Sequence, residues 1–202
     1  MNLAINIRKE EGQGNLPPWY RLTTQQRHRE MTRYAQAHQG YALTLNLRPE
    51  FADLLRDQEK PMRIIGKRMN AELNRMDLRQ LPVLMVLEAT RPEGRLHLHG
   101  VYLAGGIPKQ RIQEAMRRAV GYIPGRSGSR QFQAKLLYAA DGWNNYIVKD
   151  RGWTRKLLSL SDDEQNWWVS HRMTQIVCKD YEDTRLGRKA AANNNGPRVT
   201  AL

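Results

Sequence analysis

The fold is decided by the consecutive stretches VLMVLEAT (83–90), RPEG (91–94) and RLHLHGVYL (95–103). The first stretch is apolar up to its single acidic residue, and in the last stretch apolar and polar residues alternate. Both patterns are typical of β-strands. The proline and the glycine of 91–94 are typical of a four-residue turn. With that turn, Thr90 pairs with Arg95 and Glu88 pairs with His97 across the ladder. The stretch therefore predicts an antiparallel hairpin.

Strand-like and helix-like segments alternate on both sides of this hairpin. Upstream, 41–47 is β-prone, and apolar residues recur at helical spacing after Pro61. Downstream, Pro108 opens a helix, 131–138 is expected to be a strand, and Asp141 is expected to cap a helix that runs through Lys149. The order β-α-β-β-α-β predicts an α+β fold with a ferredoxin-like, or RRM-like, antiparallel sheet, followed by one further helix.

Extensions are expected at both ends of this domain, which we place at 41–160. Segment 1–40 is expected to be an arm followed by a helix over 23–39. Ser161 and Glu164 have the spacing of a capping box, which predicts a helix over 161–185 with Trp167 and Trp168 on its apolar side. The basic tail 186–202 has little to bury, so we expect it to be disordered.

The composition narrows the class of protein. The chain has 202 residues and a formal net charge of +13, from 33 Lys+Arg against 20 Asp+Glu. Its only cysteine, Cys178, excludes an intrachain disulfide framework. We expect no membrane partner, because no apolar run approaches the roughly 18 residues that a membrane span needs. The sequence contains no GxxxxGK[ST] phosphate loop. The positive excess favours an anionic partner, with nucleic acid as the leading candidate.

Basic residues gather in two segments, 108–130 and 149–156. Phosphate backbones bind mainly through such side chains, although a single basic cluster is more often a solvated helix face. The predicted nucleic-acid-binding residues are Lys109, Arg111, Arg118, Arg126, Arg130, Arg151 and Arg155. Trp143, Trp153 or Tyr102 could stack on bases, although packing in the core is the more frequent role of any one of them.

The hairpin also predicts a metal site. His97 and His99 lie two residues apart on a strand, so both imidazoles point to the same face. Glu88 faces His97 across the ladder, and a carboxylate in so apolar a strand needs a partner. Two histidines and a glutamate suit zinc or manganese by ligand preference, and phosphate chemistry favours Mg²⁺ or Mn²⁺. The alternative is a charge pair between Glu88 and a histidine or arginine, without a metal.

The segment YIVK (146–149) places Tyr146 and Lys149 on one face of the predicted helix. Considered alone, this spacing also fits a tyrosine that packs against Trp143 and a solvated lysine.

Taken together and in this order, Glu88, HLH (97–99) and YIVK (146–149) resemble the HUH single-strand DNA endonucleases, in particular the replication-initiator (Rep) branch. LTLN (43–46) resembles that family's first strand motif, and the resemblance covers 41–151. It implies that His97, His99 and Glu88 hold the divalent ion, that Tyr146 is the nucleophile and that Lys149 assists at the phosphate. Some members carry two tyrosines four residues apart on this helix. Gly142 and Asp150 occupy those positions here, which implies a single tyrosine. We do not expect Tyr138, eight residues upstream, to be a second nucleophile.

The implied activity is site-specific nicking and joining of single-stranded DNA through a 5′-phosphotyrosine. It would initiate rolling-circle replication of a phage, plasmid or integrated element. The implied partners are single-stranded or hairpin origin DNA, together with a separate helicase and polymerase in the cytoplasm of a bacterial host. One alternative is an HUH transposase or mobilisation relaxase. Others are a non-catalytic RRM-like binder and a metal-dependent nuclease in which Tyr146 is structural.

Overall fold

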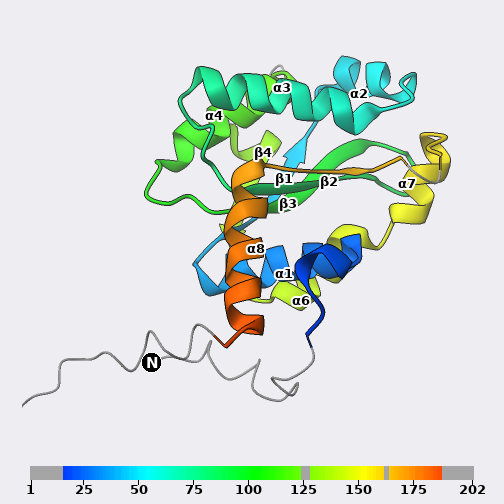
Figure 1. Ribbon diagram of the computed structural model, residues 1–202. Helices are drawn as coiled ribbons and strands as arrows, with labels where there is room; N and C mark the ends of the chain where they lie inside the picture. The colour runs from blue at the N-terminus through cyan, green and yellow to red at the C-terminus, as the bar shows by residue number, and fades with distance from the viewer. Residues whose placement is uncertain (1–15, 124–127, 162–163, 188–202) are drawn as a thin grey trace, which may run out of the picture.

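The computed structural model describes residues 16–123, 128–161 and 164–187, which form an α+β fold. A five-stranded antiparallel sheet in the order β4-β1-β3-β2-β5 lies between two layers of helices (Figure 1). The strands are β1 (Tyr41–Asn46), β2 (Val83–Ala89), β3 (Leu96–Tyr102), β4 (Phe132–Leu136) and β5 (Trp167–Val169). The helices are α1 (Thr24–Ala37), α2 (Pro49–Arg56), α3 (Pro61–Arg75), α4 (Lys109–Val120), α5 (Gly128–Gln131), α6 (Ala140–Val148), α7 (Arg151–Leu157) and α8 (His171–Arg185), and a 3-10 turn, η1 (Trp19–Arg21), precedes them.

The β2–β3 hairpin has the predicted register. Glu88 pairs with His97 along an unbroken ladder that runs from Val83–Tyr102 to Ala89–Leu96. The backbone N–H of Thr90 donates to the carbonyl of Arg95 at 3.0 Å, which closes the turn at the predicted residues. Every residue of both strands is buried, so the hairpin forms the centre of the domain.

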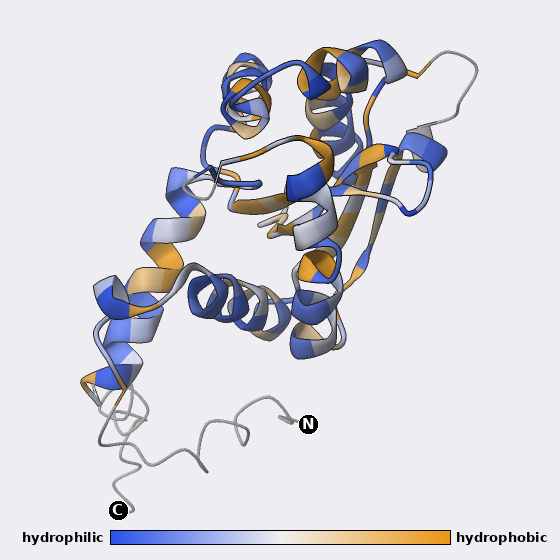
Figure 2. Cartoon of the chain, turned by 90° about the vertical axis from the view of Figure 1, so that its right-hand side faces the viewer, coloured by the Kyte–Doolittle hydropathy of each residue, from blue (hydrophilic) through white to orange (hydrophobic). Residues whose placement is uncertain are grey.

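One face of the sheet is covered by α2, α3 and α4. Apolar residues from alternate positions of the strands, such as Leu45, Leu87 and Leu98, pack there against Ile65 of α3 and Ile112 of α4. In Figure 2 the strands between the helix layers carry much hydrophobic colour, whereas the helices show mostly hydrophilic outer sides. Burial of this shared apolar surface therefore holds the layers together.

The opposite face of the sheet is covered by α1, α6 and α8. Leu84 and Val101 pack on this side against Met31 of α1 and Met173 of α8. The side chain of Thr23 accepts from the backbone of Gln26, and the side chain of Gln26 accepts from that of Thr23. This capping box starts α1 at the predicted position.

The cap predicted for α6 is wrong. The helix begins at Ala140 with Ala139 as its N-cap, so Asp141 lies inside the first turn. Its carboxylate instead accepts from Arg29 at 2.9 Å and from Arg33 at 3.2 Å, both on α1. These ion pairs hold α6 beside α1, and they lower the pKa of Asp141.

The prediction of a helix over 161–185 is also wrong at the described residues that precede His171, which are Ser161 and 164–170. Instead of a helix, Ser161 and Glu164 are joined by a single turn hydrogen bond, and Trp167–Val169 is the edge strand β5. Successive side chains of a strand point to opposite faces. Accordingly Trp168 packs against Gly66 of α3, and Trp167 makes an edge contact with His28 of α1. The helix, α8, begins at His171 with Ser170 as its N-cap.

Among the described residues, the structure adds three helices that the sequence patterns did not predict, α2, the short α5 and α7. Arg126 and the tail beyond Gly187 lie outside the described residues. Within 16–123, 128–161 and 164–187, no helix combines the length and the apolar character that crossing a bilayer requires.

Gly100 generates a prediction about stability. A Cβ added there would lie 1.9 Å from the carbonyl oxygen of Leu84, on the paired strand. We expect Gly100→Ala to lower the free energy of unfolding by about 3 kcal/mol or more, since backbone rather than a flexible side chain must move. In the control Gly152→Ala no described atom lies within 4 Å of the added Cβ, so stability should hold or rise slightly. Equal melting temperatures for both variants would contradict the close packing of β2 on β3.

His28 generates a prediction about pH. Burial, and secondarily the positive charge of Arg151, lowers the pKa of His28 to about 4. The unfolded chain therefore binds a proton between pH 6.5 and pH 4 that the folded chain excludes. Neutral His28 therefore contributes to the free energy of unfolding, and this contribution is complete above pH 6.5. It is lost as the pH falls towards 4, and the loss is about 3 kcal/mol. Urea unfolding followed by tryptophan fluorescence at pH 7 and pH 4.5 should show a smaller loss for His28→Phe. Parallel pH profiles for the two proteins would refute this.

Candidate active site

Three potential metal ligands converge on the face of the sheet that α6 covers. Glu88 from β2 and His97 and His99 from β3 offer ligand atoms that all lie within 4.8 Å of one another. The Glu88 Oε2 atom lies 3.1 Å from His99 Nε2 and 3.6 Å from His97 Nε2, and the two Nε2 atoms are 2.8 Å apart. We call these three residues the triad. Ligand atoms on one divalent ion are spaced by about 3 Å, so the triad fits a metal.

The outer nitrogen of each imidazole has a fixed partner. Nδ1 of His99 lies 2.9 Å from Oγ1 of Thr44, and Nδ1 of His97 lies 3.3 Å from the carbonyl oxygen of Arg95. With the proton on Nδ1 donated to these oxygens, both Nε2 lone pairs face the carboxylate of Glu88. Partners of this kind orient metal-binding histidines. Three lone pairs aimed at one point repel each other unless a cation lies between them.

The triad is buried, with exposed fractions of 3% for Glu88, 6% for His97 and 3% for His99. Burial alone would raise the pKa of Glu88, but where His97 and His99 carry a proton on Nε2 and donate it, their hydrogen bonds and charge outweigh burial and hold that pKa well below its usual range. Burial lowers the pKa of His99, which favours the neutral imidazole that a metal binds. When both imidazoles instead carry the proton on Nδ1, Glu88 Oε2 has no hydrogen-bond donor among the described residues. A buried carboxylate oxygen without a donor is costly, so the triad is suited to an ion.

The tyrosine helix α6 packs directly over the triad. Trp143 donates from Nε1 to the carbonyl oxygen of Gly100 at 2.9 Å, which attaches α6 to β3. The ring of Tyr146 stacks on Trp143 with centroids 5.2 Å apart and meets His99 edge-on at 5.1 Å. Tyr146 is 42% exposed, so the residue contacts the triad and still reaches solvent.

Lys149 contacts both the triad and Tyr146. Its Nζ atom lies 3.7 Å from Oε1 of Glu88 and 3.7 Å from the centre of the Tyr146 ring. An ammonium over an aromatic face gains a modest cation–π attraction. The structure therefore brings together all five residues that the sequence proposed for the metal and the chemistry.

The predicted nucleic-acid-binding residues are spread over several parts of the domain. Lys109, Arg111 and Arg118 lie on α4, which covers the face opposite the triad. Lys109 and Arg111 donate to the carbonyls of Ala134 and Met76, and Arg118 pairs with Glu114. These three residues are therefore not gathered around the triad.

The other basic residues fall elsewhere. Arg155 donates to the carbonyls of Ser161 and Glu164. Arg130 is exposed at the end of α5, and Arg151 begins α7. Binding of nucleic acid by any of them stays a prediction.

The aromatic residues considered in the sequence analysis also differ in burial. Tyr102 is fully buried and stacks on Tyr41, so the prediction that it could stack on bases is wrong. Trp153 is partly buried and lies under the guanidinium of Arg91. Tyr138 is 78% exposed on the segment before α6.

Sequence reasoning missed one residue that orients the site, Thr44, whereas the packing of Tyr146 against Trp143 was named only as the alternative to a catalytic role. Thr44 pairs with His99 in the β1–β3 register, so the register of a third strand would have been needed to find it. Comparisons of the chain with protein-family models and with curated proteins find no match.

The triad predicts stabilisation by metal. Starting from chelator-treated protein, Mn²⁺ at about 100 times its dissociation constant should add about 2.7 kcal/mol of stability and raise the melting temperature by several degrees. His99→Ala should abolish the increase because it removes one of three ligands. The control His171→Ala, an exposed histidine on α8, should keep it. The same Mn²⁺-induced shift in His99→Ala as in the unmodified protein would exclude the triad as the site.

Proposed function

We propose that this protein is a metal-dependent endonuclease of the HUH Rep type, which nicks and rejoins single-stranded DNA through a covalent phosphotyrosine. One observation carries the proposal: Tyr146 lies against His99 while Lys149 reaches Glu88, so nucleophile, cation and ligand set form one cluster. The strand order β4-β1-β3-β2 supports the finer assignment of the domain to the ferredoxin-like arrangement, with β5 added at one edge.

The ligand set would hold Mg²⁺ or Mn²⁺, whose chemistry is to withdraw charge from a non-bridging phosphate oxygen and to orient the scissile bond. Around that ion the residues of the chain have separate tasks. Thr44 keeps the ring of His99 in place, and Trp143 holds the ring of Tyr146 against it. Lys149 supplies a positive charge near the phosphate, where negative charge develops.

The reaction itself is a transesterification. The Tyr146 hydroxyl gives up its proton to solvent, which its exposed side allows, and its oxygen forms a bond to phosphorus. The bond from phosphorus to the 3′ oxygen breaks, and that oxygen takes up a proton as a free 3′ hydroxyl. Phenoxide is a workable leaving group, so a 3′ hydroxyl can attack the phosphotyrosine and reverse the step. Nicking and joining therefore use one set of residues.

The biological setting we propose is initiation of rolling-circle replication of a phage, plasmid or integrated element in a bacterial cell. Single-stranded or hairpin origin DNA would be the substrate, and a separate helicase and polymerase would follow. A transposase or relaxase would use the same chemistry on a different DNA end.

A non-catalytic RRM-like binder is less well supported, because such proteins display aromatic rings on an open sheet face. Here the corresponding face carries the buried triad beneath α6.

The test is covalent capture of DNA. Incubation with a pool of single-stranded DNA and Mn²⁺, followed by a denaturing gel and mass mapping, should give an adduct on Tyr146. Tyr146→Phe lacks the attacking oxygen and should form none while still binding DNA. Tyr138→Phe, which alters an exposed tyrosine away from the triad, is the matched control and should react fully.

Three results would overturn the proposal. A full yield of adduct with Tyr146→Phe would exclude Tyr146 as the nucleophile. Cleaved DNA that carries no protein would indicate a metal-dependent hydrolase instead. Identical adduct yields with and without a chelator would show that the reaction does not require a metal ion.

A further inference from the structure

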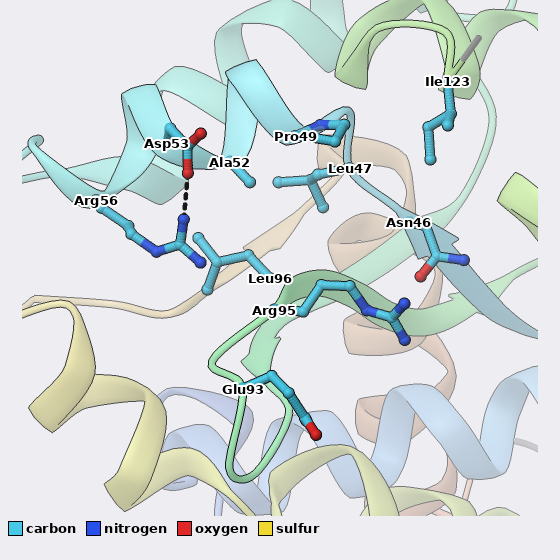
Figure 3. Close-up of a pocket in the computed structure, with 10 residues that line it drawn as sticks. All are labelled: Asn46, Leu47, Pro49, Ala52, Asp53, Arg56, Glu93, Arg95, Leu96 and Ile123. Carbon is cyan, nitrogen blue, oxygen red and sulfur yellow. Dashed lines mark hydrogen bonds and ion pairs between the residues drawn. The ribbon is translucent and has the colours of Figure 1, made fainter.

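A cavity of about 240 Å³ lies at the end of the sheet, between β1, the start of β3 and α2 (Figure 3). Its apolar walls come from Leu47, Ala52, Leu96 and Ile123. Figure 3 shows the side chains of Arg95 and Asn46 at one end and the Asp53–Arg56 pair at the other. Sites for drug-sized ligands occupy roughly 300–1,000 Å³, so this cavity suits one smaller planar group.

Two residues that line the cavity, Asn46 and Arg95, adjoin His97 of the triad. Asn46 pairs with His97 in the β1–β3 ladder, and the carbonyl of Arg95 contacts His97 Nδ1. This end of the cavity therefore lies beside His97, where a DNA strand with its phosphate at the triad would run.

Two polar side chains at the cavity, those of Arg95 and Asn46, can form further hydrogen bonds. Among the described residues, the guanidinium of Arg95 has no hydrogen-bond or ion-pair partner. Asn46 uses its Nδ2 atom to donate to the carbonyl of Arg130, which turns its amide into a fixed acceptor at the mouth. Donors and acceptors are thus both available to a ligand.

We propose that this cavity is a subsite for one unstacked base of the DNA strand beside the scissile phosphate, with Arg95 reading its polar edge; this rests on the proposed function. Apolar walls suit the faces of a base. The carboxylates of Asp53 and Glu93 also line the cavity and would repel a phosphate, whereas they can accept from the amino group of a base. Guanine presents two acceptors that match the paired N–H donors of an arginine, so guanine is the expected base.

The experiment separates binding from chemistry. Random single-stranded DNA is selected for binding to Tyr146→Phe and to the same protein carrying Arg95→Ala. The first selection should enrich guanine at one position, and Arg95→Ala should remove the enrichment and weaken binding of the selected sequence about tenfold. Arg79→Ala is the matched control, because Arg79 is an exposed arginine of the turn before β2. That variant should keep the preference.

A second variant tests the cavity itself. Ala52→Leu fills it, and its folding is checked by thermal melting. The parent should bind an oligonucleotide that lacks the base at the selected position about tenfold less well than the complete one. Ala52→Leu should bind both equally.

The outcomes distinguish the subsite from the nicking proposal. Weaker binding of every sequence by Arg95→Ala with an unchanged preference would make Arg95 a phosphate contact and overturn the base subsite, even if Tyr146 forms its adduct. A preference that depends on Arg95 in a protein that never forms an adduct would keep the subsite and overturn the nicking proposal.

Discussion

The rest of the structure depends on the ladder between β2 and β3. Its register places Glu88 opposite His97 and points His97 and His99 to the same face. A slip of one residue would turn the carboxylate into the apolar layer formed with α3 and α4, and would turn Leu87 and Leu98 outward. Gly100 also allows the close approach of β3 to the carbonyl of Leu84. The packing of the core and the geometry of the triad are therefore set by the same pairing.

A buried carboxylate near the turn end of this ladder explains why other elements lie where they do. Glu88 is stabilised by His97 and His99 on the paired strand and by Lys149 at the end of α6. Removing a carboxylate from water is costly unless charge and hydrogen bonds replace the water. Lys149 can reach Glu88 only if α6 lies over the sheet, and the ion pairs of Asp141 with Arg29 and Arg33 hold it there. The electrostatic requirement of one residue thus constrains a whole helix.

Local signals were sufficient for the hairpin, the triad and the helix that carries Tyr146, because turn residues and strand alternation act over a few neighbouring positions. They failed at 164–169, where Trp167 and Trp168 gave the apolar content expected of a helix. The two rings belong to a strand whose faces differ, since one contacts His28 and the other Gly66. Only the free edge of β2 makes that strand possible, and an edge is a property of the assembled sheet. The position of Asp141 failed for the same reason, because its partners lie more than a hundred residues away.

The net charge of +13 is a property of the composition alone. It favours an anionic partner for the chain as a whole, but it does not locate the contact surface. Arg111 and Arg155 direct their guanidinium groups to backbone carbonyls of the protein, and Arg118 pairs with Glu114. Arg95 belongs to neither basic segment, yet it stands two residues from His97 at the mouth of a cavity. A cation affects recognition according to its distance from the reacting phosphate and the partners it already has. By that criterion, one arginine at the end of β3 is a stronger candidate for reading DNA than the denser cluster on α4.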